Sequence, residues 1–142
     1  MIPIPRAVNL PLGKGEALTY KFIIQGRLPG LNDYIDALNS NRHKGNKLKQ
    51  DTEDTIIWQI KPQLRGVHIK KPVLIKYDFY EPNKKRDLDN VSSFARKTIQ
   101  DSLVKMGVLE NDGWKNILGS SEQFYCDRKN PRIEVTIVEV GD

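Results

Sequence analysis

The spacing of apolar residues changes abruptly near Asn90, and this change restricts the fold more than any other feature of the sequence. Residues 72–80 are rich in branched and aromatic side chains and are followed by Pro82 and Asn83, a pattern typical of a strand that ends in a turn. Beyond Asn90 the apolar residues recur at helical spacing: Val91, Ala95, Ile99, Leu103 and Met106. The centre of the chain is therefore predicted to pass from a strand directly into an amphipathic helix.

The segments before residue 72 predict one strand and two helices. Residues 18–25 alternate in polarity as a strand does, and the Pro29-Gly30 pair marks a turn after it. Asn32 is a candidate N-cap for a short helix. A Lys-rich loop at 42–47 would separate this helix from a longer one that stops at Pro62. The two helices could also be one broken helix.

The end of the chain predicts two more strands. They cover 114–126 and 131–140, and they could pair as neighbours across a turn at 127–130. The resulting order, β-α-β-α-β-β, predicts an α+β fold with a small mixed sheet. We expect one domain at 18–142, preceded by an N-terminal arm at 1–17.

The composition favours a soluble protein of the cytoplasm. The length of 142 residues suits one domain with a single core. The prolines of the first segment interrupt any apolar run, so it predicts neither a signal peptide nor a membrane span. Cys126 is the only cysteine, which favours a reducing compartment, and its position in a predicted strand indicates a buried, inert side chain.

Positive charge is concentrated in two short runs. Residues 1–100 carry 18 Lys and Arg against 10 Asp and Glu, whereas residues 101–142 carry 5 against 8. Such runs attract polyanions and neutralise phosphates, so nucleic acid is the favoured partner, although lysines that simply cover solvated surface are the alternative. The candidate DNA contacts are Arg42, Lys44, Lys47, Lys49, Lys84, Lys85 and Arg86.

Asp87 and Asp89 stand one residue apart, directly after the second basic run. If this stretch is extended, both carboxylates point to one side and Leu88 points to the other, into the core. Two carboxylates beside cations suit Mg²⁺, which prefers oxygen ligands and phosphate partners. The alternative is that Asp89 or Asn90 only caps the helix that follows.

The remaining polar and aromatic residues predict little further chemistry. His43 and His68 lack ligand partners at zinc-site spacing. Trp58 and Trp114 are expected to pack in the core or against helices rather than to stack on bases, although Trp114 follows Asp112 closely enough to brace that loop.

Taken together, "RDLDN", the helix after it and "GVLENDGW" resemble the RusA family of Holliday-junction resolvases, which are often prophage-encoded. The resemblance spans residues 18–140, and its most specific part runs from Arg86 to Asp112. The family outline also has a proline turn with an asparagine, a lysine and a D-x-L motif. These correspond to Pro29 with Asn32, to Lys97, and to Asp101 with Leu103.

Two positions depart from that outline. The family lysine usually follows the "DN" pair by three positions, whereas Lys97 lies seven after Asn90. Four extra residues are about one helical turn, so Lys97 stays on nearly the same face but moves about 6 Å along the axis. Asn111 replaces the first acid of the family's Asp-Asp pair.

The resemblance implies a crossover junction endodeoxyribonuclease that acts in DNA recombination and repair. Asp87, Asp89 and Asp112 would bind Mg²⁺, for which Mn²⁺ could substitute, and Lys97 would neutralise charge on the reacting phosphate. The partners would be a four-way DNA junction and a second copy of the chain, since a two-fold junction needs two cuts. No membrane and no small-molecule cofactor are expected. A non-catalytic branched-DNA-binding protein, or one of broader specificity, is the alternative.

Overall fold

The computed structural model describes residues 8–12 and 15–141, which form three helices and a five-stranded sheet. This is the α+β class and the mixed sheet that the sequence predicts. The elements are β1 (Val8–Leu12), β2 (Gly15–Gln25), α1 (Leu31–Ser40), α2 (Arg42–Ile60), β3 (Val73–Glu81), α3 (Leu88–Lys105), β4 (Ile117–Cys126) and β5 (Arg132–Glu139).

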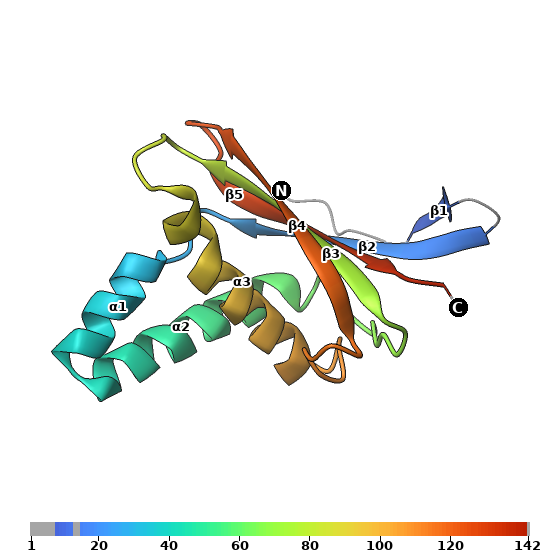
Figure 1. Ribbon diagram of the computed structural model, residues 1–142, viewed down its shortest axis with the longest axis horizontal. Helices are drawn as coiled ribbons and strands as arrows, with labels where there is room; N and C mark the ends of the chain where they lie inside the picture. The colour runs from blue at the N-terminus through green and yellow to red at the C-terminus, as the bar shows by residue number, and fades with distance from the viewer. Residues whose placement is uncertain (1–7, 13–14, 142) are drawn as a thin grey trace.

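The strands lie in the order β1-β2-β5-β3-β4 (Figure 1). The last two strands are therefore not neighbours, and the prediction that they pair across the turn at 127–130 is wrong. Helix α3 carries the chain from β3 to β4 as a crossover, so these two strands run parallel, and β5 then enters between β2 and β3 as an antiparallel strand. The sheet has one parallel pair in an otherwise antiparallel arrangement.

All three helices cover the same face of the sheet (Figure 1). Side chains of β3 and β5 alternate between buried and more exposed positions, as a sheet with one covered face requires. The covered face meets α3, whose apolar stripe of Val91, Ala95, Ile99 and Leu103 is buried as predicted. This packing fixes α3, on which the candidate site depends.

For the first half of the chain, the structure adds one detail to the predicted arm and corrects two local expectations. Strand β1 and the start of β2 fall in the predicted arm and pair as a hairpin, while residues 1–7 of that arm lie outside the described residues. The predicted loop at 42–47 is helical, because the Asn41 side chain accepts a hydrogen bond from the Lys44 amide at 2.8 Å and starts α2 there. Gly30, not Asn32, is the N-cap of α1.

Within the described ranges, none of the helices has the length and apolar character that crossing a membrane requires.

Candidate active site

The "RDLDN" stretch forms the corner between β3 and α3, and Asp87 is the N-cap of the helix. Its backbone is extended, with φ −70° and ψ 169°, and its Oδ1 atom accepts a hydrogen bond from the Asn90 amide at 2.8 Å. Leu88 and Asp89 already belong to the first helical turn. The prediction of an extended stretch with Leu88 in the core is therefore wrong, and 59% of Leu88 is exposed. The helix dipole favours both carboxylates at this position.

Arg86 fixes this corner to the end of β3. Its guanidinium donates to both carboxylate oxygens of Glu81 at 3.0 Å and to the Leu28 carbonyl at 3.1 Å. Only 16% of the side chain is exposed. A bidentate pair of this kind is directional as well as strong. Arg86 is among the predicted DNA contacts. Three of its five N–H donors bond within the chain, so the side chain also holds this corner in position.

Asn90 joins the same corner to the start of α1. Its Oδ1 atom accepts a hydrogen bond from the Asn32 amide at 2.9 Å, so the asparagine predicted near Pro29 does meet the "RDLDN" stretch. Gly30 lies directly against this asparagine, since a Cβ atom on Gly30 would come within 2.3 Å of Asn90 Oδ1. The start of α3 is thus held by β3 on one side and by α1 on the other.

A second group of charged side chains lies between α2 and α3, which we call the α2–α3 cluster: Lys49, Glu53, Lys97, Asp101, Lys105 and Asp112. Asp101 is its centre, with Lys49 Nζ at 2.9 Å and Lys97 Nζ at 3.2 Å from its carboxylate oxygens. Asp112 approaches from the loop after α3, 3.6 Å from Lys97 Nζ. All residues of the cluster except Lys97 line a hollow of about 260 Å³.

Ion pairing sets the charge state of the cluster. Burial alone would raise the pKa of Asp101, but the hydrogen bonds and charges of Lys49 and Lys97 outweigh it and hold that pKa below its usual value. The hydrogen bond to Asp101 in turn raises the pKa of Lys97, and Lys49 is affected in the same way. Lys97 is therefore a permanent cation at neutral pH, suited to anion stabilisation and not to proton transfer.

The structure brings Lys97 and Asp112 together but leaves the Asp87/Asp89 pair elsewhere. Asp89 and Lys97 are eight positions apart on the helix, which corresponds to a rise of about 12 Å. Across the described residues, no three carboxylate, imidazole or thiolate side chains gather closely enough to hold a metal ion. The predicted three-acid site is thus not assembled in this conformation. Asp87 and Asp89 alone still match the one or two carboxylates that Mg²⁺ takes together with phosphate oxygens.

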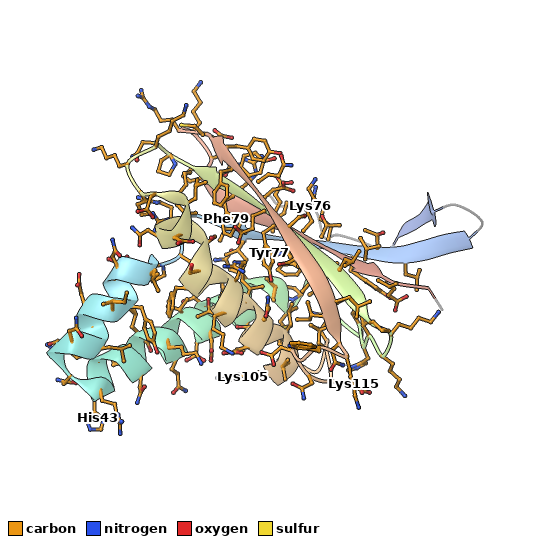
Figure 2. The ribbon with its side chains drawn as sticks, in the orientation of Figure 1. His43, Lys76, Tyr77, Phe79, Lys105 and Lys115 are labelled. Carbon is orange, nitrogen blue, oxygen red and sulfur yellow. The ribbon has the colours of Figure 1, made fainter. Side chains whose placement is uncertain are left out.

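The predicted DNA contacts fall at two places. Lys84 and Lys85 are exposed beside the Asp87 corner. The lysines and arginine of the first basic run lie in the N-terminal half of α2. Figure 2 labels His43 near the start of this helix, and Lys105 lies towards the other end of the helical layer. That run comprises Arg42 and Lys44, which are exposed, Lys47, which pairs with Asp51, and Lys49, which belongs to the cluster.

Several features were missed in the sequence. Trp58 is 81% exposed and Trp114 is 95% exposed, so the expectation that both pack in the core or against helices is wrong. Cys126, expected to be buried, is also exposed. Glu53 is only 2% exposed and pairs with Lys105, although nothing in the polar stretch around it distinguishes it from a surface residue. An exposed tryptophan gives no local signal, because its burial depends on long-range packing.

Comparisons with known proteins leave the family open. No protein-family model matches this chain, and no curated protein matches it. Among solved structures, AaThiL complexed with AMPPCP and TMP is similar at 10% identity and a TM-score of 0.39, over 94% of this chain and 35% of that one. Thiamine monophosphate kinase from Aquifex aeolicus gives 12% identity and a TM-score of 0.38, over 96% and 37%. This chain thus spans about a third of their length.

Proposed function

We propose that this protein is a Mg²⁺-dependent, structure-specific endonuclease of the RusA type that resolves four-way DNA junctions. The observation that carries the proposal is the pairing of two features on α3. An acidic pair with adjacent exposed lysines stands at the head of the helix, and a lysine further along it contacts an aspartate from the following loop. The same residues in the same chain order make up the family resemblance.

The corner at the head of α3 is built to present its carboxylates. Arg86 and Asn90 hold the backbone of this corner from two sides, so the Asp87 and Asp89 side chains start from a fixed frame. Both residues are exposed and lie next to Lys84 and Lys85, which would attract the DNA backbone towards them. Preorganisation of this kind lowers the cost of positioning a phosphate.

Mg²⁺ held by Asp87 and Asp89 would polarise the scissile phosphate and favour ionisation of the attacking water. Lys97 would balance negative charge on the substrate backbone, because its ammonium group is held in the charged form by Asp101. Asp112 and Asp101 keep that ammonium group in place until a phosphate competes for it. The expected product is a nick with a 5′-phosphate.

The proposal includes a homodimer in the cytoplasm. One chain supplies one acidic pair, whereas a junction must be cut on two opposing strands to be resolved. A C₂ dimer would present two such pairs in symmetric positions. Recognition would rest on the shape and charge of the branch more than on base edges.

A labelled synthetic four-way junction tests the proposal, compared with linear duplex of equal length, in Mg²⁺ and in chelator. Paired symmetric nicks confined to the junction and abolished by chelator are expected. Binding of the junction without nicks in either Mg²⁺ or Mn²⁺ would refute the nuclease and support the second candidate.

The second candidate is a branched-DNA-binding protein without catalysis. It is favoured by the capping hydrogen bond of Asp87 and by the separation of Asp112 from the acidic pair. In such a protein the acids would serve only the fold, so Asp89→Asn would cost a little stability through the lost helix-dipole interaction but would leave junction binding and metal response unchanged. Isothermal titration of Mg²⁺ into the wild type and this variant, with the junction bound, separates the two candidates without a nicking readout.

A further inference from the structure

A groove lies beside the α2–α3 cluster and is not used by the proposed chemistry. It encloses about 1080 Å³ between the end of α2, the turn that follows and the end of α3. Lys105 lines both this groove and the hollow of the cluster, so the two share a wall. Figure 2 shows Lys105 on the lower edge of α3, below the sheet. A strand of DNA that crosses the cluster would pass this groove.

Trp58 forms part of the groove wall and takes no part in the core. Its neighbours Ile56 and Ile60 are fully buried, whereas 81% of Trp58 is exposed on the other side of α2. An indole ring has a large flat face suited to stacking against another aromatic ring. The groove therefore offers an exposed aromatic surface on which another ring could stack.

The charges around the groove select an anion. Its charged lining residues are Lys61, Arg65 and Lys105, and the lining contains no Asp or Glu. Over the described part of the chain, neither Lys61 nor Arg65 forms an ion pair, whereas Lys105 is paired with Glu53. A ligand that combines an aromatic ring with negative charge would complement both the indole and the free cations.

We propose that this groove binds an unpaired nucleotide of the DNA substrate, with its base stacked on Trp58 and its phosphates near Lys61 and Arg65. This inference rests on the proposed function, since it takes DNA as the partner. The groove volume of about 1080 Å³ slightly exceeds the roughly 300–1,000 Å³ typical of small-ligand sites, so a nucleotide would fit with room to spare. Stacking is tolerant of base identity, so the groove would recognise a base that has left its pair at a branch point rather than a particular sequence.

The two tryptophans of the chain allow a direct test. Trp114→Phe leaves Trp58 as the only tryptophan, and its fluorescence is followed as oligothymidylate of about eight nucleotides is added, a length within the range that one single-strand site covers. We expect saturable quenching. In the same background, Trp58→Ala should weaken binding of the labelled oligonucleotide by about tenfold, measured by anisotropy, and Trp58→Phe by less.

The exposure of Trp58 means that its substitution should leave the melting temperature unchanged, which circular dichroism checks. An abasic oligonucleotide of the same length is the matched control and should bind the parent and Trp58→Ala equally weakly. The inference is overturned if both Trp58 variants bind oligothymidylate as the parent does, or if the abasic chain binds as tightly as oligothymidylate. Loss of a dimer on Trp58→Ala in sedimentation would also overturn it, because a second copy would then cover the groove.

Failure of this inference can be told from failure of the proposed function. If the wild-type chain nicks the junction in Mg²⁺ but binds the oligonucleotide equally well without Trp58, the groove proposal fails and the nuclease proposal stands. If oligonucleotide binding depends on Trp58 but no nicking occurs, the groove proposal stands and the nuclease proposal fails.

Discussion

Asp87 is assigned two roles, a helix cap and a metal ligand, and one pair of substitutions separates them. Asparagine caps a helix about as well as aspartate does, because its side-chain oxygen also accepts a hydrogen bond from the backbone. Asp87→Asn should therefore retain the 2.8 Å bond to the Asn90 amide and lose only the negative charge. Asp87→Ala should lose both.

The expected losses of stability follow from that geometry. Removing the cap costs about 0.5–2 kcal/mol, whereas removing only the charge at the positive end of α3 costs about 0.3–1 kcal/mol. For a chain of this size 1 kcal/mol corresponds to roughly 2–4 °C in melting temperature. We expect a fall of about 3 °C for Asp87→Ala and about 2 °C or less for Asp87→Asn, measured by circular dichroism.

On activity, by contrast, Asp87→Asn is expected to have a large effect even though its effect on stability is small. Asp87→Asn should abolish junction nicking while it keeps or tightens junction binding, because a carboxylate that repels phosphate has gone. Asp54→Asn is the matched control, since Asp54 is an exposed residue of α2 and its substitution changes the net charge equally. Full nicking by Asp87→Asn would refute the catalytic role. Equal melting temperatures for Asp87→Ala and Asp87→Asn would refute the cap.

Three further predictions follow from the contacts around α3. Gly30→Ala should lower the unfolding free energy by about 1–3 kcal/mol in denaturant titrations, because the new Cβ atom would come within 2.3 Å of Asn90 Oδ1. Since Lys49 and Lys97 lower the pKa of Asp101, its contribution to stability is fully present above the unfolded pKa of 3.8 and is lost as pH falls through the lower folded pKa. Acid unfolding of Asp101→Asn should therefore show a shallower pH dependence below pH 3.8 than the wild type does, and an identical profile would contradict the assignment. Lys97→Met should keep the melting temperature within about 2 °C, since the pair involves an exposed ammonium group, but should reduce nicking by at least tenfold in single-turnover assays.

The parts of the fold that could be predicted from the sequence are those set by local pattern. The apolar residues of α3 repeat at helical spacing, and the branched and aromatic residues of β3 precede a proline, so both elements could be placed before the structure was known. The pairing of β4 could not. Strands that are adjacent in sequence usually pair as a hairpin. Here the α3 crossover places β4 parallel to β3 at the edge of the sheet, and β5 pairs with the other side of β3.

The candidate site also has one part that could be predicted from the sequence and one part that could not. The acidic pair and its neighbouring cations are contiguous in sequence, and so they were found as a motif. The contact of Asp112 with Lys97, and of Glu53 with Lys105, depends on how the loop after α3 and the body of α2 pack on α3. No spacing rule contains that information. Trp58 illustrates the same limit, since its exposure is decided by which side of α2 faces the core.

The position of Lys97 connects the departures from the family outline with the geometry. Under the proposed function, the four extra residues place the lysine about one turn further along α3, and Asp112 contacts it there rather than at the head of the helix. Lys97, which Asp112 contacts, lies about 12 Å of helical rise beyond Asp89, and Asp112 does not join the acidic pair in a metal-binding group. A catalytic state that uses all three aspartates therefore requires the loop around Asp112 to leave Lys97 and approach the Asp87 corner. If the loop stays, metal binding rests on Asp87 and Asp89 alone, and Asp112 acts only through the lysine that it contacts.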